Sequence, residues 1–165
     1  MKRMLGVVVV LASLAGVCAA PAAAQAKPNF AGSWKLNLQK SDFGQMAQMA
    51  PASETDTITQ TADAFTIAVA SESEQGKRTT TSTAKLDGTD TPNAAVPDSP
   101  FQILSTKAAW QGASLVITQT TSFQDNKGTL TSTYTLSDDG KTLTKTTHVV
   151  FDQGAFDSKS VYDKA

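Results

Sequence analysis

Polar and apolar residues alternate along most of the chain after residue 53. Threonine recurs at every second position in four stretches, at 55–59, 79–83, 129–135 and 142–146. A spacing of two places each threonine row on one face of a strand, and threonine is a good strand former. Apolar side chains occupy several of the opposite rows, as Leu130 and Tyr134 do. This alternation predicts an antiparallel sheet that buries one face.

Turn-forming dipeptides separate the alternating stretches. Asp87-Gly88 and Asp139-Gly140 are the strongest hairpin signals, because glycine adopts positive φ without steric cost. Gln111-Gly112, Lys127-Gly128 and Gln153-Gly154 are weaker ones. The strands are expected at 33–38, 55–60, 64–70, 77–86, 101–110, 114–122, 129–136, 142–150 and 155–162. Their regular spacing and short connections predict an all-β fold, an antiparallel up-and-down meander barrel of about 8–9 strands.

Two stretches break the alternation. Residues 42–53 include Met46, Met49 and Pro51, and are expected to form a loop or a short helix that lines a portal or simply packs. Residues 88–100 hold three prolines and are unsuited to a central strand. This second segment is long enough to serve as a rim loop, with Pro92, Pro97 and Phe101 as its lid residues.

The first 24 residues have the features of a cleavable signal peptide. Lys2 and Arg3 precede an apolar run over 5–17, which is too short to span a bilayer comfortably. Ala22-Ala23-Ala24 supplies the small residues that signal peptidases cut after. We therefore expect a periplasmic or secreted domain over 25–165, with no stable membrane insertion after cleavage. An uncleaved membrane anchor is the alternative.

Cys18 is the only cysteine of the chain. The sequence before it resembles a bacterial lipoprotein box, but Val17 stands where that box has a small residue. Lipidation is therefore the alternative to a Cys18 that leaves with the signal peptide. If Cys18 leaves with the signal peptide, the exported domain has no cysteine and no disulfide.

Composition narrows the range of functions. The chain has 165 residues, of which 14 are basic and 15 acidic, and its formal charge is −1. Without a basic excess, nucleic-acid binding is not expected. One cysteine and one histidine provide no set of metal ligands, so we expect no metal and no cofactor. We also expect a monomer.

No nucleotide-binding, zinc-protease or nucleophile-elbow motif occurs in the sequence. His148 is the only imidazole base, and it lies inside an expected strand. Nothing in its spacing supports a Ser-His-Asp triad, so the simpler interpretation is a strand residue on the outer face or in the pocket. Haem ligation by this single histidine is the minor alternative. The catalytic set is accordingly empty.

Motifs at both ends of the chain resemble known barrel families. The segment Phe30-Ala31-Gly32-Ser33-Trp34-Lys35-Leu36 is similar to the opening of calycin barrels, the lipocalins and fatty-acid-binding proteins. Residues 160–164 are similar to the closing strand of fatty-acid-binding proteins. In that family an arginine there holds a lipid carboxylate, but this chain has Ser160, so the role is not carried over.

The 40–44 segment and the 136–143 hairpin extend the resemblance to small secreted bacterial lipocalin-like proteins. Such a barrel would use Gly32 for close chain approach and Trp34 as a structural plug at one end, with an acceptor for its indole N–H. The resemblance covers nearly all of the expected domain.

The expected ligand-binding side chains are the inward apolar rows, and the ligand is expected to be a small apolar or amphipathic molecule. These residues are Phe65, Ile67, Leu104, Leu115, Ile117, Leu130 and Tyr134, with Val69 in the same row. Two other functions stay open. A filled core would favour a protein-interaction or inhibitor module, and exposed threonine rows are also compatible with binding an ordered surface such as ice or polysaccharide.

Overall fold

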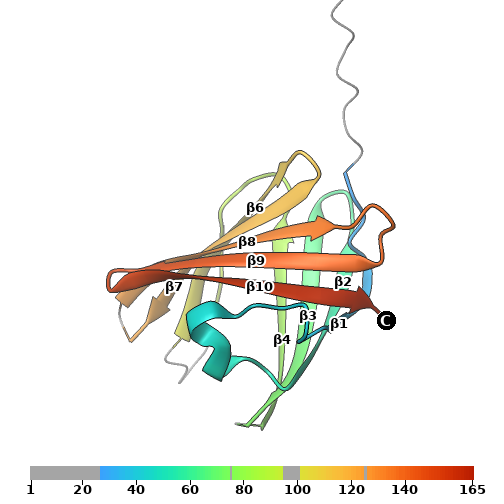
Figure 1. Ribbon diagram of the computed structural model, residues 1–165. Helices are drawn as coiled ribbons and strands as arrows, with labels where there is room; N and C mark the ends of the chain where they lie inside the picture. Colours follow the sequence, from blue (N-terminus) through green and yellow to red (C-terminus); the bar gives the residue numbers. More distant parts are fainter. Residues whose placement is uncertain (1–26, 75, 95–100, 125) are drawn as a thin grey trace, which may run out of the picture.

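The structure is a computed structural model that describes residues 27–74, 76–94, 101–124 and 126–165. The expected signal peptide therefore lies outside the described residues. Ten strands and one 3-10 helix form the fold (Figure 1). They are β1 (Gly32–Leu36), η1 (Gly44–Met49), β2 (Ser53–Gln60), β3 (Ala64–Ser73), β4 (Gly76–Lys85), β5 (Thr91–Pro92), β6 (Phe101–Gln111), β7 (Ser114–Phe123), β8 (Asn126–Leu136), β9 (Thr142–Phe151) and β10 (Gly154–Lys164).

All ten strands belong to one antiparallel sheet in the order β4-β3-β2-β1-β10-β9-β8-β7-β6-β5. Every hydrogen-bonded pair except β1–β10 joins strands that follow one another in sequence, so the sheet is a meander. β4 and β6 approach one another at the two ends of this order, and the sheet is a nearly closed barrel. The predicted all-β antiparallel barrel is confirmed, but with 10 strands instead of 8–9.

The additional strand is β5, which falls in the proline-bearing segment. Thr91 and Pro92 pair with Thr106 and Ser105 of β6. Proline lacks a backbone N–H but is tolerated at a sheet edge, where one side of the strand needs no partner. The segment was expected to be unsuited to a central strand, and β5 lies at the edge of the sheet in agreement with that expectation.

Two of the expected hairpin turns are absent. Asp87-Gly88 follows the end of β4, yet the chain then runs to β5 at the other end of the strand order, and β4 is not paired with β5. Lys127-Gly128 lies inside β8, where a Cβ on Gly128 would collide with the Phe151 ring of the neighbouring strand. Glycine serves close packing there, not a turn. Asp139-Gly140 does connect β8 to β9 as expected.

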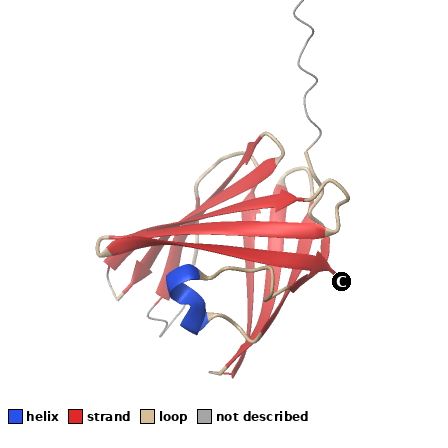
Figure 2. Ribbon diagram, in the orientation of Figure 1, coloured by secondary structure: helices blue, strands red, loops and turns tan. Residues whose placement is uncertain are grey.

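η1 covers a short stretch of open wall between β2 and β10 (Figures 1 and 2). β1 separates these strands only as far as Leu36, and beyond it Asp42 forms a single bridge with Lys159. Met46 in η1 donates its backbone N–H to the Phe43 carbonyl at 2.8 Å. The expectation of a loop or short helix over 42–53 is confirmed.

The packed core fills one end of the barrel. Trp34 and Phe30 are fully buried, and the Trp34 indole Nε1–H donates to the Phe30 carbonyl oxygen at 2.8 Å. The Phe30 ring stacks on Trp110 and meets Phe65 edge-on. Aromatic rings of this size contribute much of the buried area of a small core. The predicted structural role of Trp34 and its need for an acceptor both agree with this arrangement.

Gly32 has a different reason for being glycine than the one expected. A Cβ at this position would meet its neighbours at ordinary contact distance, 3.6 Å from Lys164 Cε. Its φ of 140° is instead a backbone conformation that residues with a side chain rarely adopt. Glycine therefore lets the chain enter β1 with Phe30 folded over Trp34.

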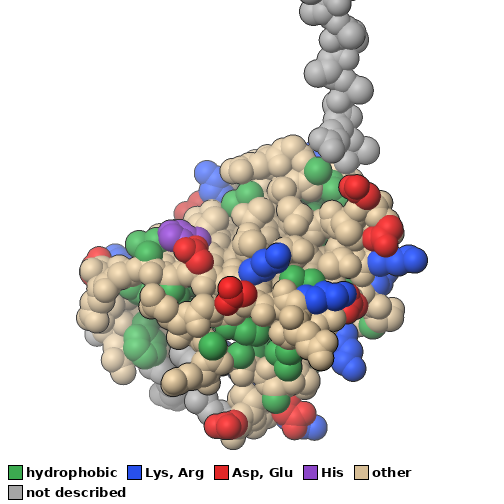
Figure 3. Space-filling view, viewed as in Figure 1, with side chains coloured by type: hydrophobic (Ala, Val, Ile, Leu, Met, Phe, Trp, Pro, Cys, Tyr) green, Lys and Arg blue, Asp and Glu red, His purple; other side chains and the backbone are tan. Residues whose placement is uncertain are grey.

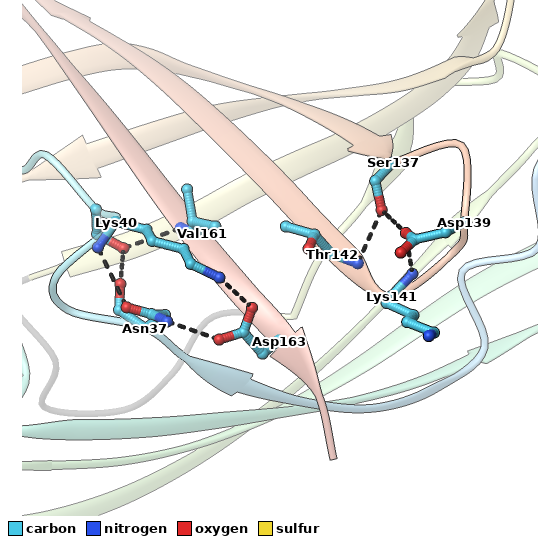
Figure 4. A network of polar contacts seen from close by, with 9 residues as sticks. Asn37, Lys40, Ser137, Asp139, Lys141, Thr142, Val161 and Asp163 are labelled. Atoms are coloured by element: carbon cyan, nitrogen blue, oxygen red, sulfur yellow. Dashed lines mark hydrogen bonds and ion pairs between the residues drawn. The ribbon is translucent and has the colours of Figure 1, made fainter.

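Two polar networks fix the loops around the ends of β10 and β9 (Figure 4). The Asp163 carboxylate accepts from Asn37 Nδ2 at 2.6 Å and from Lys40 Nζ at 2.9 Å. In the β8–β9 turn, Ser137 donates to Asp139 at 2.6 Å, which preorganises the turn around Gly140. These contacts lie at the surface, so each adds little stability by itself.

Replacing Trp34 with alanine should cost about 3–5 kcal/mol of unfolding free energy, because a large ring leaves a fully packed site. Trp34→Phe keeps most of the apolar volume but loses the indole hydrogen bond, and should fold with a lower midpoint. Thermal or urea unfolding followed by far-UV circular dichroism measures both. Trp110→Phe is the matched control, since Trp110 is only partly buried. A Trp34→Phe variant with wild-type stability would contradict the structural role.

Candidate functional site

A cavity of about 990 Å³, open to solvent on one side, lies within the barrel beyond the packed core. We call it the large cavity. Its wall combines apolar side chains with hydroxyl, amide and charged groups from β3, β4, β6, β7, β8 and β9. Small-molecule pockets in proteins commonly have about 300–1,000 Å³. The interior is therefore not a fully packed core, and its lining suits a molecule with both apolar and polar parts.

The predicted inward residues divide between the large cavity and the packed end. Ile67, Leu130 and Tyr134 line the large cavity, as does Val69. Phe65, Leu115 and Ile117 also face inward, but all three are buried within the hydrophobic core. These seven residues face inward as predicted, whereas their depth along the barrel was not predicted.

The predicted inward, ligand-binding position of Leu104 is wrong, because its side chain is 39 % exposed and does not line the large cavity. The register of β6 against β7 shifts between Ile103 and Ser105, which leaves Leu104 as the extra residue. An extra residue reverses the faces on either side of it. Ile103 lines the cavity instead.

The three proposed lid residues fall in different places. Pro92 lies in β5 and is exposed. Pro97 lies outside the described residues. Phe101 begins β6 opposite Phe123 and lines the large cavity from the wall. Phe101 is therefore a strand residue at the cavity, and the gating role of residues 88–100 stays a prediction.

A cluster of charged and phenolic side chains lies inside the barrel beside the large cavity. Lys145 Nζ is 3.6 Å from Glu54 Oε1 and 3.7 Å from Asp56 Oδ2. Tyr162 donates its hydroxyl to Glu54 Oε1 at 2.6 Å, and the Lys145 ammonium sits 5.1 Å from the Tyr162 ring centroid. We call these four residues the interior polar cluster. The cluster contains two carboxyl groups and one ammonium group.

Asp56 is the most constrained member of the interior polar cluster. Its side chain is fully buried, and neither carboxylate oxygen has a hydrogen-bond partner within the described part of the chain. Burial raises its pKa from 3.8 to about 6, with Lys145 opposing this shift and Glu54 adding to it. A buried carboxylate without a hydrogen bond is costly even beside the Lys145 ammonium, so this position weakens the fold at neutral pH.

Lys145 and Tyr162 keep their protons at neutral pH. Burial alone would lower the Lys145 pKa, but the tyrosines and the two carboxylates around it hold that pKa well above its ordinary value. Burial also raises the pKa of the Tyr162 hydroxyl, which therefore remains a donor to Glu54. The interior polar cluster consequently combines one fixed cation with carboxylate acceptors.

A second, smaller pocket of about 210 Å³ lies under η1 at the opening between β2 and β10. Phe43 and Met46 line its outer side, and Glu54 and Ser160 its inner side. Lys145 lines both this pocket and the large cavity. The expected portal position of Met46 is consistent with this placement.

The sequence analysis missed the interior polar cluster. Glu54 and Asp56 share a face with the buried Ile58, opposite the row that begins with Thr55. Likewise Lys145 shares its row with the buried Leu143. The signal in the sequence was a charged residue in a row that also contains buried apolar residues. It was not used, because the strands were assigned from the threonine rows on their opposite faces.

His148 lies on the outer surface, where 51 % of its side chain is exposed (Figure 3). Its Nδ1 is 2.6 Å from Asp157 Oδ1, and the pair borders a shallow outer hollow of about 330 Å³. The outer-face interpretation of His148 is confirmed. In the described part of the chain no group of three or more histidine, cysteine, aspartate or glutamate side chains is arranged to hold a metal. Among those residues there is also no helix long and apolar enough to cross a membrane.

No family model and no curated protein sequence matches this chain. Solved structures with the same fold are lipocalin-like, calycin-type barrels. Zebrafish ileal bile acid-binding protein complexed with cholic acid is 18 % identical, with a TM-score of 0.56, over 82 % of this chain and 98 % of that one. At such low identity the likeness shows the fold alone.

Two secretory abundant heat soluble proteins of Ramazzottius varieornatus have the same fold. One is 15 % identical with a TM-score of 0.55, and the match covers 82 % of this chain and 94 % of that one. The other, protein 4, is 14 % identical with a TM-score of 0.52, over 86 % and 97 % of the two chains. A bile acid-binding protein and secretory heat soluble proteins therefore share this barrel fold.

Asp56 predicts an unusual dependence of stability on pH. Because its folded pKa is raised, its stabilising effect is complete below pH 3.8 and is lost as the pH rises through about 6. The loss amounts to about 3 kcal/mol if the raised pKa is converted at 1.36 kcal/mol per unit. The unfolding midpoint should therefore decrease as the pH rises from about 4 to about 7.

Asp56→Asn should flatten this fall, since the amide does not ionise. Differential scanning calorimetry across that pH range measures the slope for each variant. Asp152→Asn changes an exposed aspartate by the same charge and should retain the wild-type slope. An Asp56→Asn variant that also retains the wild-type slope would show that Asp56 has an ordinary pKa.

Proposed function

We propose that this protein is a non-catalytic carrier that binds one small amphipathic molecule inside its barrel. The observation that carries the proposal is the large cavity, which adjoins a packed aromatic end on one side and the interior polar cluster on the other. An apolar tail fits against Ile67, Val69 and Leu130, while Lys145 and Tyr134 offer polar contacts in the same space.

The bile acid-binding neighbour supports this function by analogy of fold, since it holds an amphipathic ligand in a barrel of the same type. A packed interior would have favoured the alternative of an interaction or inhibitor module. The volume of the large cavity favours binding over that alternative. The exposed His148–Asp157 pair, the only imidazole–carboxylate pair among the described residues, has no assembled nucleophile hydrogen-bonded to it, so a hydrolytic role gains no support.

The proposal includes export to the periplasm or the medium as a monomer, with residues 1–24 removed. Support comes from the basic start, the apolar run and the small residues before Gln25 in the sequence. An exported carrier of apolar molecules needs its ligand shielded from water, which an interior cavity provides.

The cavity assignment predicts saturable binding of N-phenyl-1-naphthylamine, a neutral probe that fluoresces in apolar surroundings. Leu130→Trp places a large ring in the cavity and should weaken probe binding by about tenfold or more. Leu104→Trp adds the same ring on the outer face of β6 and should bind the probe as the wild type does. A fluorescence titration measures all three proteins.

Loss of binding in both tryptophan variants, or equal binding in both, would contradict the interior location of the probe. Thermal unfolding of each variant verifies that the barrel is intact. A wild-type titration without saturation would overturn the carrier function itself.

Export predicts a defined new N-terminus. When the full chain is expressed in a bacterium with an active secretion system, the protein outside the cytoplasm should begin at Gln25. Intact-mass spectrometry identifies this end, and Ala24→Arg should block its formation. A lipidated mass starting at Cys18, or retention of residues 1–24, would contradict the cleavage site.

A further inference from the structure

The interior polar cluster has hydrogen-bonding capacity that the protein itself leaves unused. Lys145 Nζ lies 3.6 and 3.7 Å from the two carboxylates, which is beyond ordinary hydrogen-bond length. Asp56 is fully buried and both of its oxygens lack a donor. Buried polar groups are normally paired, and a gap of this length commonly holds a bridging group.

The cluster is within reach of a molecule in the large cavity. Lys145 lines that cavity, and Tyr134, its register partner on β8, lines it as well. Lys145 and Glu54 are each partly accessible, with side chains 18 % and 15 % exposed. Glu54 lines the small pocket under η1 and not the large cavity, and Lys145, which lines both, connects the two spaces beside the cluster.

From this placement we infer that the interior polar cluster recognises a ligand hydroxyl group, and that it selects against a carboxylate head. The inference rests on the proposed function and adds the chemistry of the ligand. A hydroxyl accepts from the Lys145 ammonium and donates to the Glu54 carboxylate, so it fits an adjacent donor and acceptor. It can therefore bridge Lys145 and Glu54 from the side without adding charge.

A carboxylate head fits the same space poorly. It only accepts hydrogen bonds, and it would place a third negative charge beside Glu54 and Asp56 with Lys145 as the one cation of the cluster. An alkylammonium head would donate to the carboxylates, but it cannot accept a hydrogen bond from Lys145 and would lie beside that like charge. A neutral alcohol with an apolar body is the ligand class that both accepts from Lys145 and donates to Glu54.

Arg78 is the other cation on the cavity wall, and it is exposed. A carboxylate-headed ligand bound in the reverse orientation would contact Arg78 and not the cluster. The experiment therefore uses Arg78→Gln as its background, which removes this second mode of binding.

The test is displacement of N-phenyl-1-naphthylamine at pH 8 by 1-decanol, decanoate or decylammonium, which share one alkyl chain. In the Arg78→Gln background, decanol should displace the probe at a concentration at least about tenfold below that of either charged compound. Part of this difference arises from the greater hydrophobicity of decanol. The decisive quantity is therefore the ratio of the displacing concentration of decanoate to that of decanol, and how substitutions change this ratio.

Glu54→Gln removes one negative charge from the cluster and should narrow that ratio by about tenfold. Glu72→Gln removes the same charge from an exposed side chain on the outer face of β3 and should leave the ratio unchanged. Asp56→Asn repeats the charge change at the buried carboxylate and should also narrow the ratio. It provides the test if Glu54→Gln does not fold.

Hydroxyl recognition at the cluster would be overturned if the ratio of decanoate to decanol displacing concentrations is the same in all three variants, Glu54→Gln, Asp56→Asn and Glu72→Gln. It would also be overturned if decanoate or decylammonium displaces the probe better than decanol. Both results leave the carrier function intact, because the probe itself needs no hydroxyl. Absence of saturable probe binding would instead refute the carrier function.

Discussion

The unequal filling of the barrel interior is the constraint on which the other features depend. Fully buried rings pack at one end, where Trp34 donates to the Phe30 carbonyl oxygen and Phe65 meets Phe30 edge-on. This packing stabilises the nearly closed sheet without help from the opposite end. The remaining interior is then free to hold open volume and polar groups, including a buried carboxylate at Asp56 that costs stability at neutral pH.

The wall is least continuous where it adjoins this open half. β4 and β6 lie side by side without pairing, and beyond Leu36 the space between β2 and β10 is covered by η1. Short or missing edges leave backbone groups unpaired, which lowers local stability. Openings therefore coincide with the half that contains the large cavity, and the well-packed half has no need of them.

Periodicity predicted the fold class and the faces of most strands, because a spacing of two has one structural meaning in a sheet. It did not predict the bulge at Leu104, because strict alternation was extended across the point where the extra residue shifts the inward row by one position. It also did not show how far along the barrel axis each inward residue lies, so Leu115 in the packed end and Leu130 at the cavity looked alike. The interior polar cluster depends on strands β2, β9 and β10 meeting in space, which only the structure shows.

We expect a small molecule to bind in the interior of this barrel and not on its surface. Methyl NMR of the protein titrated with N-phenyl-1-naphthylamine distinguishes the two locations. Binding in the interior should produce large shift changes at Ile67 and Leu130 on the cavity wall, and leave the signals of Leu104 on the outer face unchanged. Shifts confined to Leu104 and other outward methyl groups, with Ile67 and Leu130 unchanged, would contradict it.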